Sequence, residues 1–125
     1  MLDGVKIPVG IVLFNPDIGR LKKNISAIYE NAFEIILINN GSSNRPEIDS
    51  LVMEYCKIQI IHNEKNYGIA RALNQICEWA DHNDYKYIIT LDQDSVCPDN
   101  LFEDYIKNIH LEKVGILCPL IRRCV

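Results

Sequence analysis

Two aspartates, Asp92 and Asp94, stand two residues apart directly after an apolar run, and their type and spacing suit metal chemistry. In extended chain, side chains at i and i+2 point to the same face, about 6 to 7 Å apart. That separation lets one carboxylate bind a hard divalent cation while the other binds a ribose hydroxyl or a metal-bound water. Mg²⁺ and Mn²⁺ prefer such oxygen ligands, and Mg²⁺ commonly combines one or two protein carboxylates with substrate phosphates. The alternative is a solvated turn with a helix cap near Ser95.

The aspartates belong to one of four polar loops, each of which follows an apolar, β-prone run. The loops span residues 15–17, 39–44, 63–68 and 92–95. Open α/β sheets bind their ligands beside the carboxyl ends of the strands, so these loops predict one shared ligand crevice. Asn66 and Gly68 precede a helical pattern whose first N–H groups suit a polar ligand, and Lys65 is either a phosphate neighbour or a surface lysine.

Five apolar runs predict strands, with helical patterns between them. The strands are expected at residues 7–14, 34–38, 57–62, 85–91 and 114–118. The helices are expected after a cap at Asp17, after Pro46, from Ile69 and from Leu101, each with apolar residues at three- and four-residue spacing. We predict an α/β fold of alternating βα units around a mainly parallel sheet, in a single domain over residues 1–125.

Charge, hydropathy and cysteine content exclude several functional classes. The net charge of -4 argues against nucleic-acid binding, which needs a basic face. No apolar run approaches the ~20 residues that span a bilayer, and the start has no signal-peptide pattern. The five cysteines are odd in number and widely spaced, which favours reduced thiols in a cytoplasmic protein, with Cys97 as a half-buried packing residue. The three histidines have no metal-ligand spacing and are expected to be surface or structural residues.

Four motifs taken together resemble the family-2 glycosyltransferases in order and spacing. They are Phe14-Asn15-Pro16-Asp17, Asn39-Asn40-Gly41-Ser42, Asn66-x-Gly68-x-Ala70-x-Ala72-x-Asn74 and Leu91-Asp92-Gln93-Asp94-Ser95. The Asp-Gln-Asp-Ser motif and the Asn-Pro-Asp after the first strand look like the rhamnosyltransferase branch. The resemblance implies a GT-A fold, Rossmann-like in its nucleotide-binding half, and a transferase that uses a nucleotide sugar.

The resemblance also implies roles for single residues. The implied nucleotide-binding set is Phe14, Asn15, Asn39, Gly41, Ser42, Asn66, Gly68, Asp92 and Gln93, and Asp94 with Asp92 would hold Mg²⁺ or Mn²⁺. Asn39 stands where the family usually has an aspartate that accepts a hydrogen bond from a pyrimidine ring N–H. An amide oxygen still accepts, without the added strength of a charge. The alternative interpretation makes Asn39 and Asn40 turn residues that tolerate left-handed geometry, followed by Gly41 with positive φ.

The implied partners are a nucleotide sugar (dTDP-rhamnose or a UDP-sugar) and a surface polysaccharide or lipid-linked glycan as acceptor. No catalytic base is assigned, because in this family an Asp or Glu from the second half of the domain deprotonates the acceptor. We therefore expect the 125 residues to be the N-terminal nucleotide-sugar-binding half of a catalytic domain, inactive alone. We also expect self-association through an uncovered sheet edge, and a cytoplasmic location, peripheral to the membrane in the full-length protein.

Two other functions fit parts of the pattern. A nucleotidyltransferase also uses an α/β fold with metal-binding carboxylates, but it generally has a glycine-rich, basic loop after the first strand, and residues 14–17 contain neither glycine nor lysine. A non-catalytic module that binds a nucleotide sugar, or only a partner protein, and regulates would carry the same motifs. Metal-dependent nucleotide binding by a protein with no second half would favour that module.

Overall fold

The computed structural model describes residues 6–108 of the chain, and strands and helices alternate throughout this range. The order is β1 Val9–Leu13, α1 Ile18–Ile28, β2 Ile35–Asn40, α2 Arg45–Val52, β3 Ile58–Asn63, α3 Ile69–His82, β4 Ile89–Asp92 and α4 Leu101–Asn108. The predicted α/β alternation is confirmed here. The strand expected at residues 114–118 lies outside the described residues.

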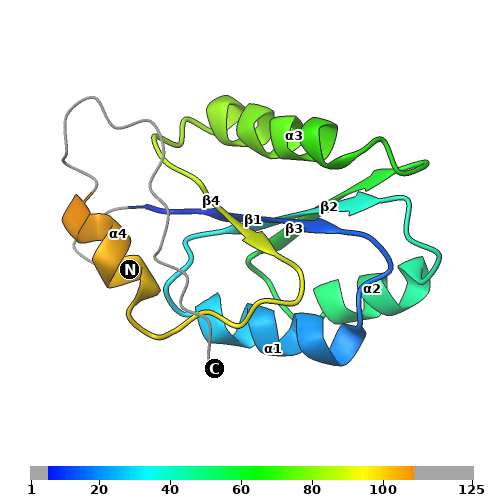
Figure 1. Ribbon diagram of the computed structural model, residues 1–125, viewed down its shortest axis with the longest axis horizontal. Helices are drawn as coiled ribbons and strands as arrows, with labels where there is room; N and C mark the ends of the chain where they lie inside the picture. The colour runs from blue at the N-terminus through cyan, green and yellow to red at the C-terminus, as the bar shows by residue number, and fades with distance from the viewer. Residues whose placement is uncertain (1–5, 109–125) are drawn as a thin grey trace, which may run out of the picture.

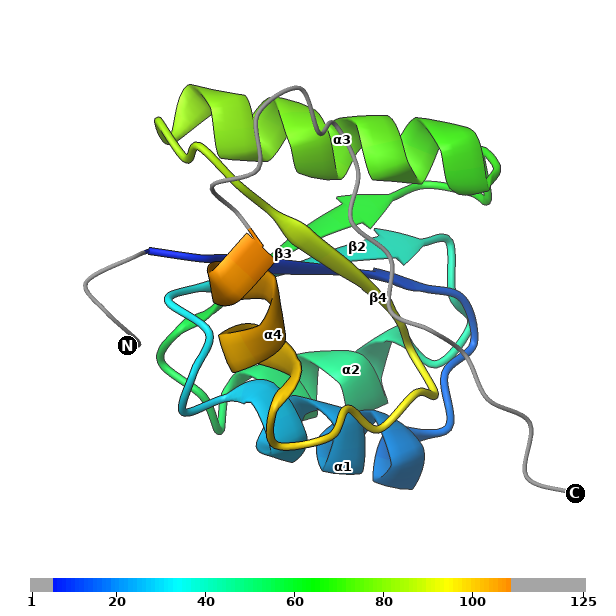
Figure 2. The same ribbon diagram turned by 60° about the vertical axis from the view of Figure 1, so that its left-hand side comes forward.

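The four strands form one parallel sheet in the order β3-β2-β1-β4. Helices α1 and α2 cover one face of this sheet and α3 covers the other (Figure 1). Helix α4 packs on the same core as α1 and α2 (Figure 2). The chain leaves β1 toward β2 on one side and returns to β4 on the other, so the strand order reverses at β1. In open parallel sheets, ligands bind at the carboxyl edge next to such a reversal.

The sheet is buried on both faces by two hydrophobic clusters. The cluster under α1, α2 and α4 takes these residues from β1 and β2: Val9, Ile11, Leu13, Ile35 and Leu37. The cluster under α3 contains Ile36, Ile38, Ala72 and Ile76. Successive residues of β2 thus point to opposite faces, as strand geometry requires. Apolar residues at every position of β2 up to Ile38 are therefore explained by burial on both sides.

Close packing of α3 on the sheet depends on Gly10 in β1. A Cβ at this position would lie 2.4 Å from Cγ2 of Ile76, far inside the ~3.5–4.0 Å of ordinary carbon–carbon contact. Ile76 is fully buried, so it has little room to move away. Gly10 therefore sets how closely α3, together with the loop that precedes it, can approach β1.

The starts of the first two helices follow the expected sequence signals. The side chain of Asp17 accepts a hydrogen bond from the backbone N–H of Arg20 at 3.0 Å, which caps α1. Pro46 lies in the first turn of α2, where its missing N–H costs nothing.

Strand β4 is shorter than the sequence predicts, because it begins at Ile89 instead of residue 85. The ring of Tyr85 stacks on Trp79 at 5.4 Å, and its hydroxyl donates to Oε2 of Glu34 at 2.8 Å. Burial and the neighbouring Glu34 carboxylate raise the pKa of the Tyr85 hydroxyl. These contacts hold Tyr85 against α3 and outside β4.

Strands β3 and β4 are the outer strands of the sheet formed by residues 6–108, and the expected self-association through an edge stays a prediction. No helix in this part of the chain combines the length and apolarity needed to span a bilayer.

Candidate functional site

The loop after β1 and the turn after β2 interlock through side-chain hydrogen bonds. Oγ of Ser42 accepts from the backbone N–H of Asn15 at 2.9 Å. Oδ1 of Asn15 accepts from the backbone N–H of Ser43 at 2.7 Å and from its hydroxyl at 3.1 Å. Nδ2 of Asn44 donates to the carbonyl oxygen of Pro16 at 2.8 Å. Asn15 has a φ of 45°, a left-handed conformation that asparagine tolerates better than most residues.

Asn39 and Asn40 are the last residues of β2, whereas the sequence places them in a turn. Each is only 2% exposed. Asn39 pairs with His62 of β3 and Asn40 pairs with Asn63, so both belong to the sheet, and the turn interpretation is wrong for them. Since neighbouring strand residues point to opposite faces, Asn39 faces α2 and Asn40 faces α3. Gly41 does have the positive φ expected of it, at 78°.

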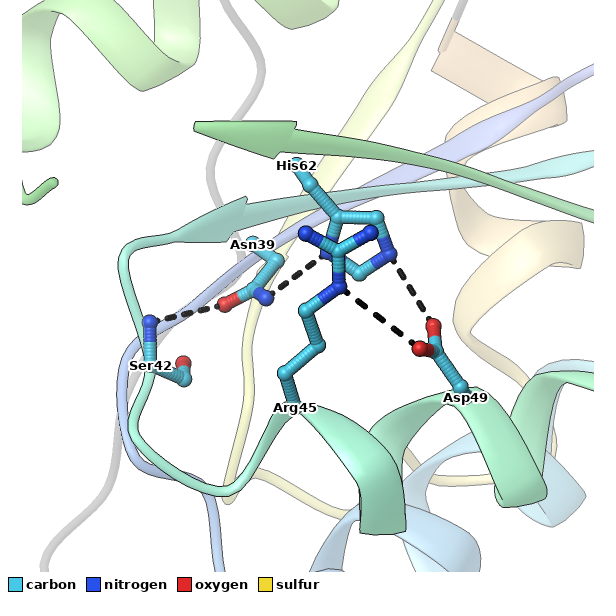
Figure 3. Close-up of polar contacts among 5 residues, drawn as sticks. All are labelled: Asn39, Ser42, Arg45, Asp49 and His62. Atoms are coloured by element: carbon cyan, nitrogen blue, oxygen red, sulfur yellow. Dashed lines mark hydrogen bonds and ion pairs between the residues drawn. The ribbon is translucent and has the colours of Figure 1, made fainter. Parts of the chain in front are cut away.

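A chain of polar contacts runs from Asn39 across to α2 (Figure 3). Oδ1 of Asn39 accepts from the backbone N–H of Ser42 at 3.1 Å, and Nδ2 lies 2.9 Å from Nδ1 of His62. Nε2 of His62 lies 3.0 Å from Oδ1 of Asp49. Oδ2 of Asp49 is 3.6 Å from Nε of Arg45. His62 is therefore a structural residue, as expected, but one that contacts a predicted nucleotide-binding residue.

Asn40 organises the loop that precedes α3. Its Nδ2 donates to Oδ1 of Asn66 at 3.0 Å and to the carbonyl oxygen of Gly68 at 3.3 Å. Its Oδ1 accepts from the backbone N–H of Tyr67 at 3.1 Å and from Nδ2 of Asn63 at 3.2 Å. Oδ1 of Asn66 also accepts from the backbone N–H of Gly68 at 2.8 Å. One buried amide thus attaches the whole Asn66-x-Gly68 motif to β2.

The same loop lies against the turn after β2 because Gly41 has no side chain. A Cβ on Gly41 would lie 2.5 Å from the carbonyl carbon and 2.6 Å from Cα of Lys65. Both are backbone atoms, so no side-chain rotation could relieve the overlap. Gly68 has φ 92° and ψ 160°, a conformation essentially restricted to glycine, and the space around it is open.

The two aspartates lie at the end of β4, but not in the geometry that the sequence predicts. The strand ends at Asp92, and a turn follows in which the backbone N–H of Ser95 donates to the Asp92 carbonyl at 3.4 Å. Asp94 is in this turn, so the expected extended, same-face arrangement is wrong. Gln93 bridges back to β1: its Oε1 accepts from the N–H of Phe14 at 2.9 Å and its Nε2 donates to the Phe14 carbonyl at 3.1 Å. Both carboxylates are exposed.

Asn24 supports the same turn from inside the protein. It is fully buried in α1, and its Nδ2 donates to the carbonyl oxygen of Asp92 at 2.7 Å. Its Oδ1 is buried and has no hydrogen-bond partner among residues 6–108. Asn24 belongs to none of the four sequence motifs. The available signal is its place on the apolar stripe of α1, three residues after Leu21 and next to Ile25.

All the predicted site residues lie at the carboxyl edge of the sheet, which is where the loops after parallel strands meet. The ring of Phe14 is 45% exposed, while Asn39 is buried. Within residues 6–108, no group of three or more His, Cys, Asp or Glu side chains is arranged to hold a metal ion by itself. A Mg²⁺ that takes its other ligands from a diphosphate needs only one or two carboxylates, so Asp92 and Asp94 fit that use.

Positive charge is present at this edge on the loop before α3, at Lys65, and in the first turn of α3, at Arg71. Cζ of Arg71 lies 4.2 Å, and Nζ of Lys65 5.6 Å, from the ring centroid of Tyr67. Both cationic side chains belong to exposed residues. Cys97, four residues after Gln93, is half-buried against the α1-side core, as expected, and burial raises the pKa of its thiol.

Comparison with known proteins agrees with this arrangement. The family model described as glycosyl transferase family 2 matches residues 9–125, a range that includes all four motif loops. A search of curated proteins found no match. The chain therefore belongs to glycosyltransferase family 2, the transferases that move a sugar from a nucleotide-sugar donor to a glycan acceptor.

Proposed function

We propose that this chain binds the nucleotide-sugar donor at the carboxyl edge of its sheet. The observation that supports this most is the hydrogen bonding of the loop after β1 to the turn after β2, and of the last residue of β2 to the loop after β3, beside two exposed carboxylates at the end of β4. The proposed nucleotide-binding residues are Phe14, Asn15, Asn39, Gly41, Ser42, Asn66, Gly68, Asp92 and Gln93. Asp94, with Asp92, is proposed to bind Mg²⁺ or Mn²⁺.

The chemistry of each group suits the part assigned to it. The half-exposed ring of Phe14 offers a face for a base, and Oδ1 of Asn39 retains a second lone pair after accepting from Ser42. The side-chain amide of Gln93 is bonded to the backbone of Phe14, so besides its proposed place in the nucleotide site Gln93 holds Phe14 in position. The cation, when bound, neutralises the diphosphate charge that builds up as the glycosidic bond breaks.

We further propose rhamnose, carried as dTDP-rhamnose, as the sugar, with a UDP-sugar as the other donor to be tested. Support comes from the similarity of Asp92-Gln93-Asp94-Ser95 and Asn15-Pro16-Asp17 to the rhamnosyltransferase branch. The proposed acceptor is a surface polysaccharide or a lipid-linked glycan. The proposed location is the cytoplasm, at the cytoplasmic surface of the membrane.

Calorimetric titration of dTDP and UDP, with and without Mn²⁺, tests the donor site. Asp94→Ala should abolish the metal-dependent part of binding. Asp99→Ala is the matched control, because Asp99 is also exposed and lies in the same loop, outside the motif. Metal-dependent binding that is lost only in Asp94→Ala would support the proposal. Equal binding by both variants, or no binding of either nucleotide to the unmodified chain, would refute it.

A further inference from the structure

Asn39 differs from an aspartate because its two terminal side-chain atoms are not equivalent. Oδ1 accepts hydrogen bonds and Nδ2 donates them, and rotation of the amide exchanges the two. The ring N3–H of uracil or thymine requires an acceptor, whereas N3 of cytosine requires a donor. The orientation of the Asn39 amide therefore decides which pyrimidine the site accepts.

Two groups fix this orientation. The backbone N–H of Ser42, 3.1 Å from Oδ1, can only donate, so it requires the oxygen on its side. Nδ1 of His62, 2.9 Å from Nδ2 of Asn39, completes the arrangement only when it carries no proton. We propose that His62, as the Nε2–H tautomer, is a positioning residue that holds the Asn39 oxygen toward the nucleotide and so sets a preference for uracil or thymine over cytosine. The inference rests on the proposed donor site.

Asp49 selects that tautomer of His62. Its Oδ1 lies 3.0 Å from Nε2 of His62, and a carboxylate accepts without donating, so the ring proton is placed on Nε2. Arg45 approaches the other carboxylate oxygen at 3.6 Å (Figure 3). The His62 side chain is 16% exposed, so water has little access to compete for its nitrogens. With His62 as the Nε2–H tautomer, the contacts form a series from Asn39 through His62 to Asp49 in which each donor faces an acceptor.

The tautomer can be observed without any nucleotide. In the uniformly ¹⁵N-labelled chain, the ring nitrogens of His62, assigned by their loss in His62→Gln, should show a protonated Nε2 and an unprotonated Nδ1. Asn39→Asp replaces the donor next to Nδ1 with an acceptor, so Nδ1 should gain a proton at the same pH. A protonated Nδ1 in the unmodified chain would overturn the inference directly.

The functional consequence is tested by titrating UDP, dTDP and CDP into four proteins. The unmodified chain should bind UDP and dTDP more tightly than CDP. His62→Ala removes one of the two groups that fix the Asn39 amide, and the preference should fall by about three- to tenfold, the factor that corresponds to one hydrogen bond. Asp49→Ala removes the carboxylate that selects the His62 tautomer, and it does so at a partly exposed position on α2. The preference for UDP and dTDP over CDP should therefore fall, but by less than in His62→Ala. His82→Gln, at an exposed position at the end of α3, should leave it unchanged.

A merely structural His62 would weaken all three nucleotides equally, and an unchanged ratio of affinities in His62→Ala and Asp49→Ala would therefore overturn the inference. If no nucleotide binds to the unmodified chain, the donor site itself is refuted, and the base-orienting role of His62 is refuted with it. The ring-nitrogen spectra of His62 need no nucleotide, so they still show whether the proposed tautomer is present when the donor site fails.

Discussion

Replacing Gly10 with alanine should destabilise the contact between β1 and α3, and the size of the effect follows from the distances to Ile76. The new methyl group would lie 2.4, 2.9 and 3.1 Å from Cγ2, Cδ1 and Cγ1 of Ile76. Contacts of about 3.5–4.0 Å are normal, so either helix α3 or the side chain of Ile76 must move by roughly 1 Å. Overpacking of this kind costs about 1–3 kcal/mol. The lower chain entropy of alanine offsets on the order of 0.5–1 kcal/mol of that cost.

A double-mutant cycle isolates this contact. Ile76→Ala alone should lower the free energy of unfolding by about 2–5 kcal/mol, because it leaves a cavity at a fully buried site. In Gly10→Ala/Ile76→Ala the overlap is gone and the new methyl fills part of the cavity. The double variant should therefore be no less stable than Ile76→Ala. Urea denaturation of the four proteins measures the coupling, which should reach about 1 kcal/mol or more.

The control is Ile48→Ala, which also empties a fully buried site but lies on α2, across the sheet from Gly10. Its effect should add to that of Gly10→Ala within about 0.5 kcal/mol. Additivity in the Gly10/Ile76 cycle would refute the claim that Gly10 sets the spacing between β1 and α3. A stabilising Gly10→Ala would refute it as well.

Three further predictions concern the site and its support. Gly41→Ala should lower the free energy of unfolding by about 2–5 kcal/mol in urea denaturation, because of left-handed strain and overlap with the Lys65 backbone. The control Gly19→Ala lies in α1, where a new Cβ meets nothing nearer than 3.4 Å, and should be neutral or slightly stabilising. Equal effects of the two substitutions would contradict the packing argument. Asn24→Asp should destabilise the fold more at pH 7 than at pH 5, because an ionised carboxylate would face the Asp92 carbonyl in a buried site, whereas its protonated form can donate to it; a pH-independent loss would count against the hydrogen bond. Cys97 should be alkylated at least about tenfold more slowly than the exposed Cys77 at pH 8, because burial raises the pKa of the Cys97 thiol and lowers its thiolate fraction. Peptide mass spectrometry measures the two alkylation rates, and equal rates would contradict the prediction.

The fold was largely predictable because its signals are local. A continuous apolar run such as that of β2 indicates a strand buried on both faces, and Asp17 and Pro46 mark helix starts within a few residues of themselves. The order of four polar motifs predicted the family, which the family match confirmed. The strand ends were less predictable. Asn39 and Asn40 are typical turn residues, and it is pairing with the neighbouring strands, with Leu13 of β1 and with His62 and Asn63 of β3, that keeps them in the sheet.

The sequence by itself determined the alternation of strands and helices, the buried strands and the chemical types of the residues at their carboxyl ends. The tertiary structure alone decided what those side chains contact, because their partners are distant in sequence: Asn39 meets His62, 23 residues away, and Asn24 meets Asp92, 68 residues away. It also decided that Asn39 and Asn40 serve opposite faces of the sheet, since that depends on how far β2 extends. The spacing of apolar residues indicates which face of a helix or strand is buried. The direction of a hydrogen bond depends instead on groups that only the packed sheet brings together.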